Sequence, residues 1–134
     1  MSYEIVRPAD VFPPVSQYSH AVRADTSRIV YLAGQIAVDE QGNIVGPGDC
    51  GAQTRQVFGN IERVLAAAGA SWGTVVRLTT YLARVEDIPA YRAVREELFS
   101  RLYPTADYPA HTLLVVQALA APEYLVEIEA TAIL

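Results

Sequence analysis

The sequence predicts an α+β fold in which strands and two helices alternate within one unit. Three observations support this prediction. Short β-branched and apolar segments near the start and at the end of the chain are typical of strands, one long stretch carries an apolar stripe at helical spacing, and a second helical pattern lies between strands. The 134 residues suit one hydrophobic core, and we expect a single domain over residues 1–134.

The first part of the chain predicts strands. Residues 19–23 and 28–33 are two candidate strands around a polar turn at 25–27. Residues 35–38 continue the strand pattern after Gly34, and a glycine inside a strand is typical of a β-bulge. We therefore expect three strand segments before the first helix.

The pattern changes at residue 49. Apolar residues recur at i, i+4, i+7, i+8 and i+11, which places them on one side of a helix over 49–68; these are Val57, Ile61, Val64, Leu65 and Ala68. Gly69 then fits the position after the helix end, where a positive φ costs glycine little. This is the first predicted helix.

The remaining elements follow from the same two periodicities. Residues 74–85 predict a strand, 88–102 a second helix, and 113–116 and 125–130 two final strands. Inward positions on the second helix include Tyr91, Leu98 and Leu102. With both helices on one face of the sheet, the other face is expected to be apolar and to be buried in an oligomer.

Composition excludes some classes of protein. The net charge is −5, which disfavours nucleic acid as a partner, since phosphate binding requires clustered basic residues. No apolar run approaches the roughly 18 residues that span a bilayer, and the start has no signal-peptide pattern, so we expect a cytoplasmic protein without a membrane partner. Cys50 and two histidines form no familiar metal-binding spacing, and we expect no metal and no cofactor.

Two segments carry candidate chemistry. His111 precedes the apolar strand 113–116, and its ordinary pKa of about 6.5 suits anion binding or proton transfer near neutral pH. A structural, hydrogen-bonded histidine is the alternative. Glu127 and Glu129 are two residues apart and therefore point to the same side of a strand. They form either a solvated strand face or, where one is partly buried with a raised pKa, a general acid or base.

These segments resemble the Rid family of reactive-intermediate deaminases, also called the YjgF family. The similarity extends over nearly the whole chain in order and spacing, through residues 16–19, 32–36, 53–54, 60–61, 65–71, 109–112 and 126–130. The resemblance implies a chorismate-mutase-like α+β fold with a single mixed sheet and two helices on one face. It also implies a homotrimer with the sheets facing inward and small-molecule clefts between subunits.

The resemblance also implies roles for particular residues. Glu127 would line the cleft and handle the attacking water, Tyr18 would pack over the substrate, and the backbone of Gly34 would approach it. The alternatives are an ordinary core aromatic at Tyr18 and a simple bulge at Gly34. Thr112 and Leu113 follow His111 and complete the predicted binding wall.

The sequence departs from the family pattern at four positions. His111 stands where deaminating members have an arginine that grips the substrate carboxylate. Ala33 replaces a serine, Leu113 a cysteine, and Arg92 an asparagine on the second helix. Arg92 could supply the missing carboxylate clamp from a new direction, or it is a solvated helix arginine.

Three functions remain open at this stage. The first is hydrolytic deamination of a small enamine or imine other than the usual 2-imino acids, with His111 and Glu127 as catalytic candidates. The second is non-enzymatic binding of a small metabolite in the same cleft. The third is ribonuclease activity, which the acidic balance and the lack of a basic patch make the weakest.

Overall fold

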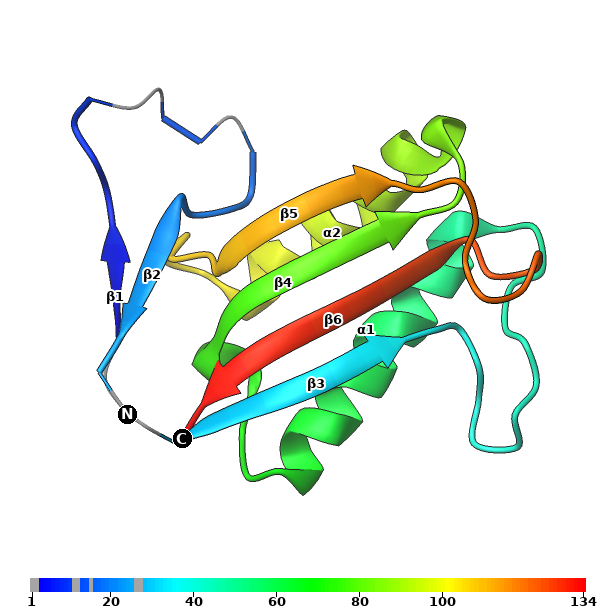
Figure 1. The fold of residues 1–134 in the computed structure, drawn as a ribbon, viewed down its shortest axis with the longest axis horizontal. Coiled ribbons are helices and arrows are strands. Elements are labelled where there is room, and N and C mark those ends of the chain that lie inside the picture. Colours follow the sequence, from blue (N-terminus) through cyan, green and yellow to red (C-terminus); the bar gives the residue numbers. More distant parts are fainter. Residues whose placement is uncertain (1–2, 11–12, 15, 26–27) are drawn as a thin grey trace.

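A four-stranded mixed sheet with two helices on one face forms the body of the molecule (Figure 1). The computed structural model describes residues 3–10, 13–14, 16–25 and 28–134. The strand order across the sheet is β3 (Ile29–Gln35), β6 (Val126–Ile133), β4 (Val75–Leu82) and β5 (Ala110–Val115). Only β4 and β5 are parallel. Helices α1 (Cys50–Ala67) and α2 (Ile88–Leu102) lie behind this sheet, which confirms the predicted fold class.

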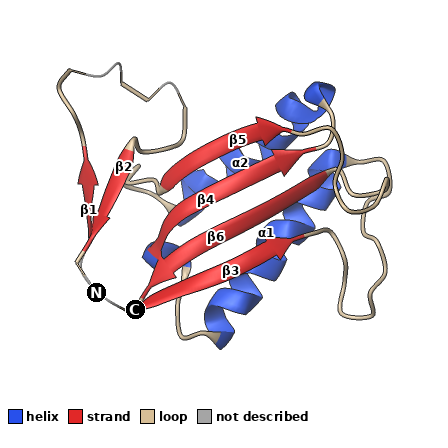
Figure 2. Ribbon diagram, in the orientation of Figure 1, coloured by secondary structure: helices blue, strands red, loops and turns tan. Residues whose placement is uncertain are grey.

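The N-terminal strands stand apart from this sheet (Figure 2). β1 (Tyr3–Val6) pairs with β2 (Ala21–Ala24) in a separate antiparallel ribbon. β1 was not predicted, because four residues are too few to show a period. The prediction of a strand over 35–38 was wrong beyond Gln35; Val38 forms only an isolated bridge with Ile44. Residues 26 and 27 of the predicted turn lie outside the described residues.

Helix α1 confirms its predicted limits, and its ends explain them. Asp49 caps the start by accepting a hydrogen bond from the Ala52 backbone N–H at 3.0 Å. At the other end Gly69 has φ 78°, its N–H donates to Ala66, and the Ala70 N–H donates to Leu65. These two bonds form a Schellman motif, which satisfies carbonyls that the helix itself leaves unpaired.

The core lies between the helices and the sheet. Tyr91 and Phe99 of α2 are fully buried, and Leu98 and Leu102 pack against the core as predicted. The aromatic ring of Phe99 lies within 6.4 Å, between ring centroids, of four other aromatic rings: Phe58, Trp72, Tyr103 and Tyr108. Two 3₁₀ helices, η1 (Trp72–Thr74) and η2 (Val85–Asp87), flank β4, so that strand ends at Leu82 rather than at 85.

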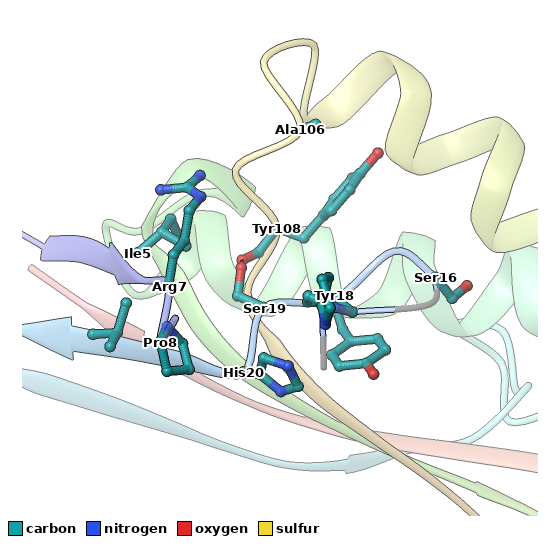
Figure 3. A pocket seen from close by; sticks show the side chains of 12 residues that line it. Ile5, Arg7, Pro8, Ser16, Tyr18, Ser19, His20, Ala106 and Tyr108 are labelled. Atoms are coloured by element: carbon teal, nitrogen blue, oxygen red, sulfur yellow. Dashed lines mark hydrogen bonds between the residues drawn. The ribbon is translucent and has the colours of Figure 1, made fainter. Parts of the chain in front are cut away.

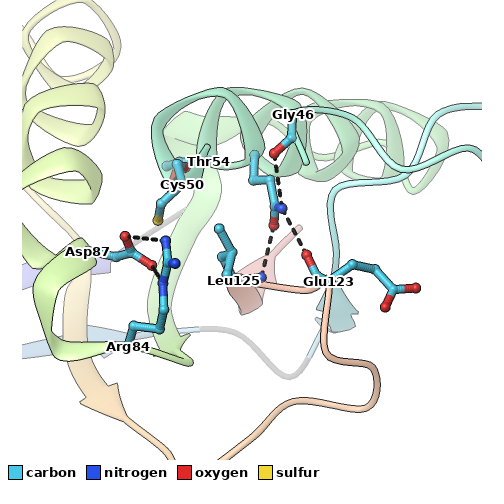
Figure 4. A network of polar contacts seen from close by, with 8 residues as sticks. Gly46, Cys50, Thr54, Arg84, Asp87, Glu123 and Leu125 are labelled. Atoms are coloured by element: carbon cyan, nitrogen blue, oxygen red, sulfur yellow. Dashed lines mark hydrogen bonds and ion pairs between the residues drawn. The ribbon is translucent and has the colours of Figure 1, made fainter. Parts of the chain in front are cut away.

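A buried amide fixes the loop before β6 (Figure 4). The Gln53 side chain, on α1, donates to the carbonyls of Gly46 and Glu123 and accepts from the Leu125 N–H at 2.9 Å. All polar atoms of this side chain therefore find backbone partners although it is fully buried. Close by, Arg84 makes a two-point ion pair with Asp87 at 2.7 and 2.9 Å. The Gln53 contacts fix Leu125, the residue directly before the strand that carries Glu127.

Candidate functional site

His111 lies on β5 and points toward α2. Its register partner in β4 is Leu78, which is buried on the helix-covered face. The imidazole Nε2 lies 2.8 Å from Thr80 Oγ1 and 3.2 Å from the Tyr91 hydroxyl. Burial, followed by the positive charge of Arg95, lowers the pKa of His111 to about 3. The ring is therefore neutral near pH 7 and bonded to two hydroxyl groups.

Arg95 is the cation beside this histidine. It is 5 % exposed, and its guanidinium Cζ lies 5.6 Å from the ring centroid of Tyr91, while the His111 ring lies 6.3 Å from the same ring. Arg95 Nη2 donates to Ser16 Oγ at 2.6 Å. The sequence suggested Arg92 for this role, but Arg92 is exposed and makes none of these contacts. Arg95 follows the predicted inward residue Tyr91 by four positions, about one helical turn, and therefore lies on the same side of the helix. This spacing was the signal that would have identified Arg95.

Three buried polar atoms at this junction have no hydrogen-bond partner among the described residues. They are Arg95 Nε, His111 Nδ1 and Gln17 Oε1, and the described part of the chain contains no other such side-chain atom. Gln17 belongs to the same place, since its Nε2 contacts the carbonyl of Glu96 on α2 at 3.5 Å. Buried polar groups are normally paired, so these three atoms stand out among the described residues.

Glu127 lies on the opposite face of the sheet. From Val126 to Ala132, β6 alternates between buried and partly exposed residues, and Glu127 pairs in register with Tyr81 on the face without helices. A Cβ built on Gly34 would overlap the Glu127 carboxylate, so the carboxylate rests directly on the Gly34 backbone. Ala33 and Gly34 form a bulge between Leu32 and Gln35, as the glycine predicted.

His111 and Glu127 consequently cannot reach one group within a single chain. His111 contacts Thr80 and Tyr91 on the helix side, whereas Glu127 sits with Tyr81 on the other side. The sheet itself separates them. A site that used both side chains would need two copies of the chain.

The face without helices, called the open face below, is more polar than predicted. Tyr81 donates to Glu129 Oε1 at 2.8 Å, and this bond raises the pKa of the Tyr81 phenol. A hollow of about 170 Å³ beside Glu129 is lined by Tyr31, Leu32, Arg77, Thr79, Glu129, Ala130 and Thr131. Three large exposed side chains with apolar surface lie on the described part of this face: Ile29 at 44 % exposure, Tyr31 at 77 % and Leu114 at 42 %. The expected apolar surface is therefore present on the two outer strands, β3 and β5, while polar residues occupy most outward positions of β4 and β6.

Tyr18 lies at a second, larger pocket (Figure 3). The cavity has a volume of about 340 Å³ and is formed by residues 5–8, 13–14 and 16–20 and by the loop before β5. Tyr18 packs edge-on against His20, with 5.8 Å between ring centroids. Ser19 donates to the Tyr108 carbonyl and its N–H to the Pro109 carbonyl, which joins this segment to the start of β5. Ser16, the partner of Arg95, also lines this pocket.

The remaining predicted binding residues divide between the two faces of β5. Thr112 pairs with Thr79 and is exposed on the open face, whereas Leu113 pairs with Thr80 and packs against the core.

The described residues contain no group of three or more His, Cys, Asp or Glu that could hold a metal ion. Burial raises the pKa of the Cys50 thiol to about 11, so this cysteine is no nucleophile at neutral pH. In the described residues, no helix has the length and apolar character needed to cross a membrane.

Comparison with known proteins found a matching family. The model of the family described as Endoribonuclease L-PSP matches residues 9–134. The crystal structure of YyfB from Yersinia pestis, a protein of unknown function in the Rid family, matches 100 % of both chains with 40 % sequence identity and a TM-score of 0.87.

Two curated relatives carry an activity in their names. The chain is 35 % identical over 132 residues to the 3-aminoacrylate deaminase RutC of Acinetobacter baylyi, covering 98 % of each protein. It is 32 % identical over 129 residues to the 2-iminobutanoate/2-iminopropanoate deaminase of Capra hircus, covering 96 % of this chain and 88 % of the relative.

Proposed function

Because this chain belongs to the Rid family, whose model is described as Endoribonuclease L-PSP, we propose that it hydrolyses a small enamine or imine to a carbonyl compound and ammonia. The names of the RutC and Capra hircus relatives support this reaction class. The observation that carries the proposal is the Glu127 carboxylate, which lies against the side-chain-free backbone of Gly34 on the open face.

The reaction needs one proton carrier and one positioned water. The water oxygen attacks the C=N carbon, the π electron pair moves to nitrogen, and nitrogen takes up a proton. A second proton on nitrogen lets ammonia leave, while the hydroxyl proton is removed and the C=O bond forms. Glu127 is the group proposed to accept the proton from water and return it to nitrogen. His111 serves as a neutral hydrogen-bonding group, since its pKa of about 3 excludes it as an acid near pH 7.

The site is proposed to lie between copies of the chain. The sheet separates Glu127 from His111, so a cleft that uses both must combine the open face of one copy with the β5 edge of another. Tyr31, 77 % exposed on the open face, supports burial of this face in an assembly. The resemblance described above leads us to propose a homotrimer, and a cytoplasmic location remains part of the same proposal.

Ammonia release tests the reaction. Imines are generated freshly from amino acids by an amino acid oxidase with catalase, and ammonia formation is followed with and without the protein. Glu127→Gln should lower the accelerated rate by about a hundredfold to ten-thousandfold, the usual contribution of general acid–base catalysis. Glu129→Gln is the matched control, because a glutamine oxygen still accepts the Tyr81 hydroxyl, and its rate should stay within a few-fold.

A non-catalytic binding protein is the second candidate. It is favoured by the saturation of His111 Nε2 with two hydroxyl partners and by Ala33, which offers no hydroxyl group. Binding of the carbonyl product without any acceleration of imine hydrolysis would establish it. RNA cleavage, the third possibility, is checked with the same protein on single-stranded RNA, where the net charge of −5 predicts no activity.

A further inference from the structure

Arg95 is a buried cation without an anionic partner. None of the ion pairs in the described part of the chain includes it, and the residues outside that part contain no Asp or Glu. Removing a guanidinium from water is costly unless a counter-charge and hydrogen bonds replace the lost solvation. Its stacking on Tyr91 and its bond to Ser16 meet only part of that requirement, since Nε remains unpaired.

The neighbouring unpaired atoms show what kind of partner fits. A hydroxyl that donates to His111 Nε2 leaves the single proton of the neutral ring on Nδ1, which is then a second unpaired donor in addition to Arg95 Nε. Gln17 Oε1 is an unpaired acceptor, because its amide Nε2 is turned toward the Glu96 carbonyl. Two donors and one acceptor suit a planar carboxylate next to an N–H or O–H group better than a phosphate, whose oxygens Gln17 would repel.

We propose that Arg95, His111 Nδ1 and Gln17 form a carboxylate-binding site, with the guanidinium supplied by α2 rather than by the strand position 111. This inference rests on the proposed function in one respect, namely that the bound carboxylate is part of the imine substrate. The 340 Å³ pocket beside Tyr18 lies next to this site, since Ser16 lines that pocket and accepts a hydrogen bond from Arg95, and it is the proposed route of entry. The chain would then act on carboxylate-bearing imines despite having histidine at position 111.

Ligand discrimination tests the site without requiring catalysis. 2-Oxobutanoate and its neutral amide differ in the carboxylate, and their binding to the unmodified protein is measured by calorimetry. The carboxylate should bind about ten- to a hundredfold more tightly, as expected for a charge-assisted hydrogen-bonded pair. Arg95→Met should abolish this preference, and Arg92→Met, on the exposed side of the same helix, should retain it.

A second readout follows ligand binding in the unmodified protein and uses a conservative variant only to assign the signal. The Arg95 Nε–H signal in a ¹⁵N-correlated spectrum of the unmodified protein, identified by its absence in Arg95→Lys, should shift on titration with 2-oxobutanoate and stay in place with the amide. Equal affinity for both ligands, or an unshifted Nε–H, would overturn the site. Carboxylate binding without ammonia release would leave the site intact and refute the deaminase, and the reverse result would refute the site alone.

Discussion

The two faces of the main sheet are built from alternate residues of the same strands, yet they differ in what they bind. On the helix side, Thr80 and His111 share hydrogen bonds with the fully buried Tyr91. On the open face, Tyr81 and Glu129 share a bond next to solvent, and Glu127 rests on Gly34. The sheet therefore separates a histidine held neutral on its helix side from two carboxylates on its open face.

The largest effect is expected for a substitution that disturbs the proposed burial of the open face between copies of the chain. Tyr31→Glu places a charge where a second copy is expected, and the mass in light scattering should fall from about three times 14.6 kDa to the monomer value. Val64→Glu, on the outer surface of α1, is the control and should leave the assembly intact. If the unmodified protein is monomeric at micromolar concentration, the proposed burial of the open face between copies is refuted.

Substitutions at two neighbouring residues of β6 compare how much each face of the sheet contributes to the free energy of unfolding. Ile128 is fully buried, and Ile128→Ala should lower the free energy of unfolding by about 2–5 kcal/mol through lost burial and an added cavity. Glu127→Ala, one residue earlier, should change it by no more than about 0.5 kcal/mol. Denaturant unfolding at fixed protein concentration measures both, and similar losses would show that Glu127 is structural.

The adjacent threonines of β4 give a smaller version of the same test. Thr80→Val removes a hydroxyl shared by Tyr91 and His111 and should cost about 1–3 kcal/mol, because buried partners lose a hydrogen bond. Thr79→Val, facing the open side, should be nearly neutral, since valine also favours strands. Equal effects on the unfolding midpoint would contradict the assignment of Thr80 to the helix side.

Periodicity predicted the elements whose stability is local. The stripe around Ile61 and the glycine at position 69 define α1, because helical spacing and the Schellman end both depend on nearby residues. β1 escaped prediction, since its four residues gain strand character only by pairing with residues 21–24. Long-range pairing of this kind leaves no periodic signal in a short segment.

The candidate site was predictable only in part. The bulge at Gly34 followed from a glycine inside a strand, and the shared face of Glu127 and Glu129 followed from their spacing of two. The sequence could not show that His111 faces α2, because the facing of β5 is set by its pairing with β4. It pointed to Arg92, which is exposed, whereas the arginine four positions after the inward-facing Tyr91 is the buried one.

The neutral state of His111 predicts a loss of stability in mild acid. In the unfolded chain this histidine has a pKa near 6.5, and in the folded chain burial lowers the pKa to about 3, so between these values the unfolded state binds more protons. The stabilisation is therefore complete above pH 6.5 and is lost as the pH falls toward 3. At pH 5.5 the loss should reach about 1.4 kcal/mol relative to pH 7.5.

The matched variant is His111→Gln, which keeps one donor and one acceptor and removes the titration. Denaturant unfolding at pH 7.5, 6.5 and 5.5 should show this additional acid sensitivity in the parent protein and its absence in the variant, while other groups shift both curves equally. A parallel pH dependence in the two proteins would mean that His111 titrates near its ordinary pKa. The ring would then be charged at pH 5.5 beside Arg95, and the helix side of the sheet would be less sealed from water than its contacts with Thr80 and Tyr91 indicate.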